Sequence, residues 1–172
     1  MCLTHKKDVF IDFCSAIKLL FMVKKRKETW QILKPIAVMP NPLYVKEIKD
    51  NYDGLSISLQ NREYSRFNPS FGIIKFDTFL TYRVTDEGDL LKTLYEIENP
   101  DCLGISFLFT VDNSLYLKWF CEQCYDIHDK NQITHYLIAT TADVVDILNL
   151  HEPRVILSDS SFPRRSYSVD IS

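Results

Sequence analysis

The chain has 172 residues, of which 46% are hydrophobic and 25% are charged, and its net charge is −3. This length and composition are typical of one globular domain and exclude a disordered or fibrous protein. The four glycines lie too far apart to form a phosphate-binding loop, which excludes nucleotide binding through a P-loop or a Rossmann turn.

The N-terminal segment, residues 1–21, is amphipathic, since its apolar residues fall on one face of a helix. Lys18 interrupts its apolar run, which is too short for a membrane span and lacks the form of a secretory signal. Two interpretations stay open, a docking helix or upstream sequence outside the natural product. The second is slightly favoured because Met22 and the basic run after it have the form of a start. We expect one domain over 22–158 and a mobile tail over 159–172.

The first half of the chain is rich in strand patterns. Residues 29–38 alternate before a group of prolines, which predicts an edge strand or an extended arm. A turn is predicted at 51–54, followed by a half-buried antiparallel strand over 55–59. Residues 71–85 indicate one long strand. Its expected common face consists of Ile74, Phe76, Thr78, Leu80, Tyr82 and Val84.

The second half alternates between helix and strand patterns. Helices are predicted over 86–97, with acids in the first turn, over 115–124 after the N-cap Ser114, and over 144–148 after a capping box. The expected strands are 103–111, 135–140 and 154–157. This order predicts an α+β fold, with a mixed or mostly antiparallel sheet and helices packed on one face.

The five cysteines are an odd number at irregular spacing, which indicates reduced thiols in a cytosol. Cys121 and Cys124 form a C-x-x-C pair, but His128 and His135 follow seven residues apart, which does not fit a structural zinc site. The pair also falls at the end of the predicted helix, whereas a thioredoxin-like thiol lies at a helix start. We therefore predict no metal and no cofactor.

Nucleophilic catalysis requires a serine or cysteine on a tight turn within reach of a histidine. No G-x-S-x-G motif is present. Ser114 and His135 can in principle pair, but helix capping is the simpler explanation for Ser114. No catalytic residue is assigned on this basis.

Charge is unevenly distributed. The basic clusters at 24–27 and 164–165 are short and terminal, which favours solvated ends over nucleic-acid binding. Residues 77–101 hold seven acidic and two basic residues, a local charge of −5. Such a stretch is a solvated face, a surface that captures a basic partner, or a carboxylate site for metal-dependent hydrolysis. Exposed aromatic residues on 116–125 would add anchors for a partner.

Several short stretches resemble immunity proteins of bacterial polymorphic or contact-dependent toxin systems, over roughly residues 76–157. They are Phe76-Asp77, Tyr82 to Asp89, Val111 to Ser114, His135-Tyr136 with Thr140, Asp143 to Leu148, and Glu152-Pro153. The resemblance implies a cytosolic protein that protects its own cell by masking a cognate toxin, often a nuclease.

The working hypothesis is a cytoplasmic, toxin-neutralising protein that binds a basic toxin domain without nucleic acid, membrane or cofactor. Two alternatives stay open: a small metal-dependent hydrolase or nuclease using the acidic residues, and a structural or regulatory subunit of a mobile-element assembly. The candidate partner-binding residues are Arg83, Asp86, Glu87, Asp89, Asp112 and Trp119.

Overall fold

The computed structural model describes residues 27–33, 42–61, 70–102 and 105–157. The predicted N-terminal segment, the predicted tail and the basic clusters, apart from Lys27, lie outside these residues. Within the described part of the chain, no helix is long and apolar enough to cross a membrane.

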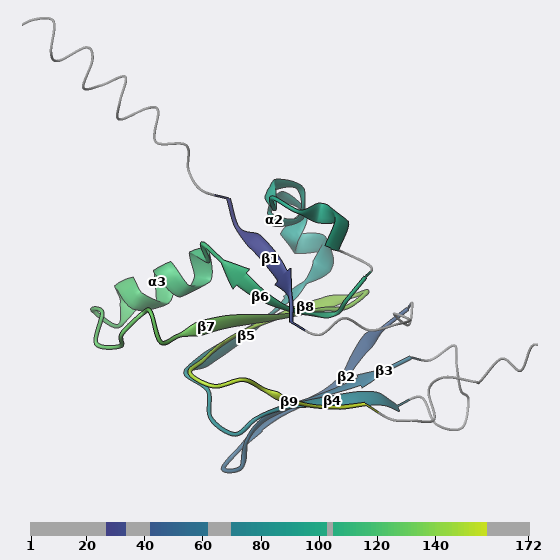
Figure 1. Cartoon of the computed structure of the whole chain (residues 1–172). Helices are drawn as coiled ribbons and strands as arrows, with labels where there is room; N and C mark the ends of the chain where they lie inside the picture. Colours follow the sequence, from purple (N-terminus) through teal and green to yellow (C-terminus); the bar gives the residue numbers. More distant parts are fainter. Residues whose placement is uncertain (1–26, 34–41, 62–69, 103–104, 158–172) are drawn as a thin grey trace, which may run out of the picture.

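Two antiparallel sheets lie one above the other (Figure 1). One sheet has the order β1 (Thr29–Ile32), β6 (Leu108–Asp112), β7 (Thr134–Ala139), β8 (Asp143–Asn149) and β5 (Thr81–Asp86). The other has the order β2 (Tyr44–Asn51), β3 (Gly54–Gln60), β4 (Ser70–Phe76) and β9 (Arg154–Leu157). The prediction of a mostly antiparallel, sheet-rich fold is confirmed, although the strands divide into two sheets.

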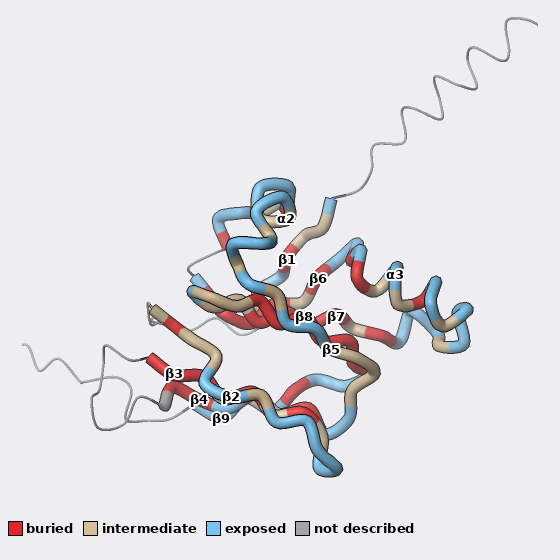
Figure 2. Tube along the Cα trace, turned by 180° about the vertical axis from the view of Figure 1, so that it is seen from behind, coloured by how far each residue is buried: buried red, intermediate tan, exposed pale blue. Residues whose placement is uncertain are grey.

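The main core lies between the two sheets, where the buried strand faces meet (Figure 2). Side chains of a strand alternate between its faces, so Leu55, Ile57 and Leu59 of β3 all point into this core. Aromatic rings join the layers: Phe76 of β4 meets Tyr136 of β7 edge-on, with ring centroids 5.6 Å apart. Apolar burial between the layers is therefore the main stabilisation of this fold.

The outer face of the five-stranded sheet is covered by short helices, η1 (Glu87–Leu90), α2 (Leu91–Glu96), η2 (Pro100–Cys102) and α3 (Leu115–Gln123). Leu90, Leu94 and Ile97 join a cluster with sheet residues, and Tyr116 of α3 packs with Leu148 of β8. Consequently β7 and β8 are buried on both faces, and any polar side chain on them needs a partner.

Several predicted elements are confirmed. Of the stretch 29–38, residues 29–32 form the edge strand β1, and residues 34–38 lie outside the described residues. As predicted, α3 follows Ser114 and β9 spans residues 154–157. The turn before β3 contains Gly54 at φ +100°, and a Cβ there would lie 2.2 Å from the Phe76 carbonyl oxygen. Only glycine fits this turn.

The prediction of one strand over 71–85 is wrong. After Phe76 the chain bends and passes to the other sheet, where the Leu80 amide donates to the Leu148 carbonyl. An ion pair between Asp77 and Arg154 lies at this crossing. The apolar alternation continues through the bend, which is why the sequence pattern alone gave no sign of a break.

The prediction of a helix over 144–148 is also wrong, because these residues lie in β8. Thr140 forms the turn that joins β7 to β8, with its Oγ1 accepting from the Asp143 amide over 2.9 Å and its own amide donating to the Asp143 carbonyl. The threonine therefore stabilises a hairpin turn instead of a helix start. A strand covered on both faces shows a continuous apolar run, which is easily mistaken for a short buried helix.

Candidate functional site

A strand-to-helix turn places Ser114 at the outer face of the five-stranded sheet. Asn113, directly after β6, adopts the left-handed conformation with φ +56°, which asparagine tolerates better than most residues. Ser114 then begins α3 as its N-cap, and its Oγ accepts from the Leu117 amide over 2.9 Å. The predicted capping role of Ser114 is confirmed.

Ser114 is also the first member of a hydrogen-bonded chain that crosses three strands. Its Oγ lies 2.7 Å from His135 Nδ1, and His135 Nε2 lies 2.9 Å from Asp146 Oδ1. The other oxygen of that carboxylate, Oδ2, accepts from Arg83 Nε over 2.6 Å. The pairing of Ser114 with His135, which the sequence left as the less simple explanation, is present together with the cap.

Strand register explains why these residues meet. Arg83 on β5 and Leu137 on β7 both lie directly opposite Asp146 on β8. His135 is two residues from Leu137 along β7, so it is the diagonal neighbour of Asp146 on the same face of the sheet. Residues 63 and 11 positions from Asp146 in the sequence are thereby brought to its two carboxylate oxygens.

The buried carboxylate is held in its charged form. Burial alone would raise the pKa of Asp146, but the hydrogen bonds and charges of His135 and Arg83 outweigh burial and lower that pKa below its ordinary value. Because an ionised carboxylate can only accept, His135 Nε2 donates to Asp146. In the tautomer that carries its proton on Nε2, Nδ1 accepts from the Ser114 hydroxyl. All three side chains are thus satisfied, as polar groups on a doubly covered sheet must be.

Two aromatic rings extend the hydrogen-bonded chain from Arg83 toward the surface. The Arg83 guanidinium carbon lies 4.3 Å from the centroid of the Tyr116 ring, and the Tyr116 hydroxyl is 3.1 Å from Thr81 Oγ1. Trp119 stacks on Tyr116 with centroids 5.7 Å apart and an interplanar angle of 11°. Trp119 is half exposed, so one of its sides is available to a partner.

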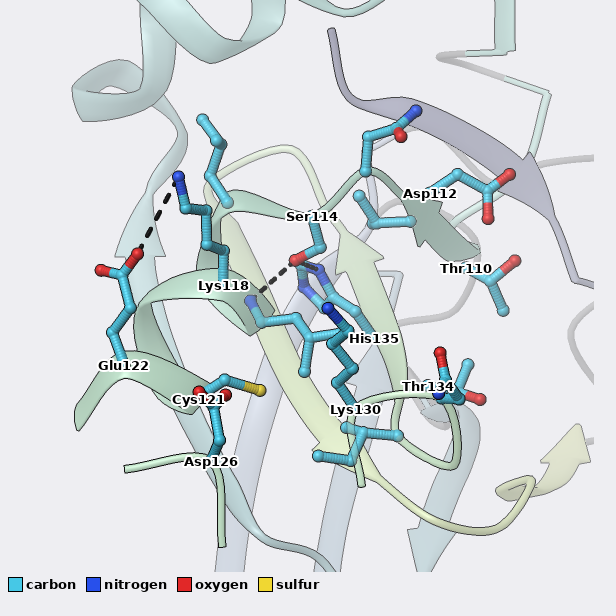
Figure 3. Close-up of a pocket in the computed structure, with 16 residues that line it drawn as sticks. Thr110, Asp112, Ser114, Lys118, Cys121, Glu122, Asp126, Lys130, Thr134 and His135 are labelled. Atoms are coloured by element: carbon cyan, nitrogen blue, oxygen red, sulfur yellow. Dashed lines mark hydrogen bonds and ion pairs between the residues drawn. The ribbon is translucent and has the colours of Figure 1, made fainter. Parts of the chain in front are cut away.

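A pocket of about 1000 Å³ opens beside Ser114 and His135 (Figure 3). Its lining includes Lys118 and Cys121 of α3 and Lys130 of the following loop. Burial, followed by the neighbouring Cys124 and Asp126, raises the pKa of the Cys121 thiol, which therefore stays protonated. Within the described residues no three histidine, cysteine or acidic side chains are grouped to hold a metal ion.

The acidic junction after β5 forms a second surface. Asp86 caps the 3-10 turn η1, with its Oδ1 accepting from the Gly88 amide over 2.8 Å, and Asp89 lies exposed in the same turn. Leu91 and Tyr95 follow on α2 with exposed fractions of 55% and 85%. The acidic segment therefore displays two large apolar side chains that the sequence did not single out.

The six candidate partner-binding residues lie in three separate parts of the structure. Arg83 and Trp119 both contact Tyr116. The acids of the junction lie together at the end of β5 and in η1, with Asp86 as the N-cap and Glu87 and Asp89 in the turn itself. Asp112 lies apart from both groups, in the lining of the pocket beside Ser114. Asp146 was missed because its segment was expected to be helical, which hid its alternation with apolar neighbours on the sheet.

Comparison of the chain with protein-family models, with curated proteins and with solved structures finds no match.

Proposed function

We propose that this chain is an immunity-type protein, which captures a basic toxin domain on an acidic face formed by η1 and α2. The observation that carries the proposal is the exposure of Leu91 and Tyr95 within the acidic segment. Large exposed apolar side chains surrounded by charge are typical of binding surfaces, and tyrosine is frequent among the residues that dominate binding energy.

The arrangement of α2 supports a docking role. Leu90 and Leu94 pack inward against the outer face of the sheet. Leu91 and Tyr95, one position further along in each case, are spaced i, i+4 and form an outward apolar stripe. The helix is therefore fixed to the sheet on one side and is open to a partner on the other.

The charge around this apolar stripe indicates which kind of partner it binds. The exposed or half-exposed acids around this stripe are Asp86, Glu87, Asp89 and Glu96. Among the described residues none of these four has an ion-pair partner. Unpaired acids attract a basic surface and speed its association, which favours a cationic partner such as a nuclease domain.

Trp119 and Arg83 extend the proposed face along β5. Both side chains are about half exposed, and both contact the Tyr116 ring. Tryptophan and arginine are enriched at binding hot spots, and a ring already stacked loses little conformational entropy on binding. The alternatives have less support: no metal-ligand group is present among the described residues, and no observation favours an assembly subunit.

Co-expression tests the proposal. The product of the neighbouring gene, as the candidate toxin, is produced alone, with the wild-type chain, and with the double variant Leu91→Ser, Tyr95→Ser. We expect the wild-type chain to protect the cells and to co-purify with the toxin, and the double variant to do neither. A Tyr52→Ser variant is the matched control, since Tyr52 is fully exposed on the β2–β3 turn of the other sheet. No complex and no protection with the wild-type chain would contradict the proposal.

A further inference from the structure

The pocket beside Ser114 contains polar side chains that the proposed toxin binding does not require. Ser114 and His135 line this pocket, where their side chains form a hydrogen bond (Figure 3). Asp146 lies at hydrogen-bond distance from the other nitrogen of His135. We propose that Ser114, His135 and Asp146 are the nucleophile, base and orienting carboxylate of an esterase site, independent of the proposed toxin binding.

The hydrogen bonds of Ser114 Oγ leave it free to act as a nucleophile. Ser114 Oγ lies 2.7 Å from His135 Nδ1, within the reach of about 2.6–3.2 Å typical of an activated nucleophile, and its hydroxyl donates to Nδ1 when the imidazole proton is on Nε2. One lone pair accepts from the Leu117 amide, and the second lone pair has no partner among the described side chains. Capping the helix and attacking a substrate are therefore compatible roles for the same oxygen.

The imidazole is oriented by its second nitrogen. Asp146 accepts from His135 Nε2, which keeps the proton on that nitrogen and leaves Nδ1 as the base. Arg83 holds the other carboxylate oxygen and so fixes the orientation of Asp146. In serine proteases the histidine Nε2 faces the serine and Nδ1 faces the aspartate, whereas here Nδ1 faces Ser114 and Nε2 faces Asp146. Either imidazole nitrogen is a competent base when the other carries the proton.

The turn before α3 provides stabilisation for a developing negative charge. α3 has nine residues, and the positive end of its dipole lies at Ser114. The Leu115 amide, whose acceptor is Glu28 Oε1, and the Leu117 amide, whose acceptor is Ser114 Oγ, lie at this helix start among the residues that line the pocket. The dipole of α3 therefore favours negative charge on the carbonyl oxygen of a bound ester.

The reaction is the hydrolysis of a carboxylic ester with water as the co-reactant. Ser114 Oγ adds to the carbonyl carbon while its proton passes to His135 Nδ1. The intermediate then expels the alcohol, which takes that proton, and leaves an ester on Ser114. Water, deprotonated by His135, adds to this ester, and its collapse releases the carboxylic acid and returns the proton to Ser114 Oγ.

The pocket limits the substrate class. A volume of about 1000 Å³ is at the upper end of ordinary small-molecule sites. Ile133 and Leu117 supply apolar lining. The charged lining consists of two lysines, Lys118 and Lys130, and three acids, Asp112, Glu122 and Asp126, and Lys118 forms an ion pair with Glu122. The lining fits a small ester with an apolar acyl chain better than a folded protein substrate.

Hydrolysis of p-nitrophenyl butyrate and labelling by a fluorophosphonate test the site. Asparagine is as good an N-cap as serine, so Ser114→Asn keeps the cap and removes the nucleophile. We expect Ser114→Asn to lower kcat/KM by at least ~1000-fold and Asp146→Asn to lower kcat by at least ~100-fold. In the wild-type chain, peptide mapping should place the phosphonate on Ser114.

The matched control is Ser56→Asn, the same change at a half-buried position on β3 of the other sheet. It should leave both hydrolysis and labelling at wild-type levels. Labelling of the wild-type chain needs no variant, so a folding defect in Ser114→Asn does not prevent a decision. The proposal is wrong if the wild-type chain hydrolyses the ester no faster than Ser114→Asn, or if the phosphonate attaches to another residue.

Discussion

Arg83 and Asp146 lie directly opposite each other on β5 and β8, and Arg83 Nε donates to Asp146 Oδ2 over 2.6 Å. The carboxylate is almost fully buried, while about half of the arginine side chain remains exposed. His135 holds the other oxygen from the buried side. The pair therefore connects a buried polar chain with a half-exposed surface residue, and its loss affects stability as well as the proposed chemistry.

Replacement of Asp146 by asparagine is expected to change how stability depends on pH. The pKa of Asp146 is lowered below 3.8 in the folded chain, so its stabilisation is present above pH 3.8 and is lost as the pH falls through the folded value. We expect Asp146→Asn to cost about 1.5–3 kcal/mol of unfolding free energy at pH 7, typical of hydrogen bonds to a charged group. Urea denaturation between pH 7 and pH 3 measures the difference.

The difference between wild type and Asp146→Asn should narrow as the pH approaches 3. Asp50→Asn is the control, since Asp50 is an exposed carboxyl on β2. A difference that stays constant between pH 7 and pH 3 would show that the charge of Asp146 does not stabilise the fold.

Val145→Ala tests the strand assignment of β8. Alanine has the higher helix propensity, so the change would be neutral or stabilising if this segment were helical. Because Val145 is buried between the sheets, we expect a loss of about 2–3 kcal/mol of unfolding free energy from lost burial and the cavity left behind.

Lys92→Ala is the matched control for Val145→Ala, because Lys92 is exposed on α2. It should change stability by less than about 0.5 kcal/mol. Thermal unfolding measures both variants, and an undiminished stability of Val145→Ala would contradict the position of β8 between the layers.

Elements with local signals were predictable from the sequence. Ser114 predicts the start of α3 because serine is a favourable N-cap, and Gly54 indicates a turn that no other residue fits. The strict alternation of residues 55–59 identifies β3, since one face of that strand meets the core and the other does not. Each of these features depends on neighbours in the chain, which the sequence displays directly.

Features that depend on distant neighbours were not predictable. Because both faces of β8 are buried, its sequence lacks the alternation of apolar and polar residues that identifies a strand. The place of Asp146 on the sheet was therefore not predictable. The division into two sheets depends on the crossing after Phe76, which the apolar alternation does not mark. The exposure of Tyr95 is a property of the packed fold, because Leu94 next to it has the same apolar character and packs inward.

The acids of the junction are expected to act on the rate of association. Asp86→Asn with Asp89→Asn removes two charges and keeps the cap on η1, since asparagine also caps. We expect the association rate constant with the toxin to fall about tenfold at low salt, with little change in dissociation, because charge mainly steers encounter. Stopped-flow measurement at two salt concentrations tests this.

The control for that pair is Asp50→Asn with Asp53→Asn, an equal loss of charge at the exposed end of β2 and in the β2–β3 turn. It should slow association much less than the junction variant. Equal slowing by both pairs would mean that net charge alone, and not the η1–α2 face, steers the partner.

The dissociation constant for the candidate toxin, the product of the neighbouring gene, tests the proposed function most directly when it is measured by calorimetry for wild type, Tyr95→Ala and Tyr52→Ala. Tyr95 and Tyr52 are both strongly exposed, but Tyr95 lies on α2 and Tyr52 lies on the β2–β3 turn of the four-stranded sheet. We expect Tyr95→Ala to weaken binding at least ~30-fold, as loss of a hot spot of about 2 kcal/mol does, and Tyr52→Ala to change it less than ~2-fold. Absence of binding by the wild-type chain, or equal affinities for Tyr95→Ala and wild type, would contradict toxin capture by the η1–α2 face.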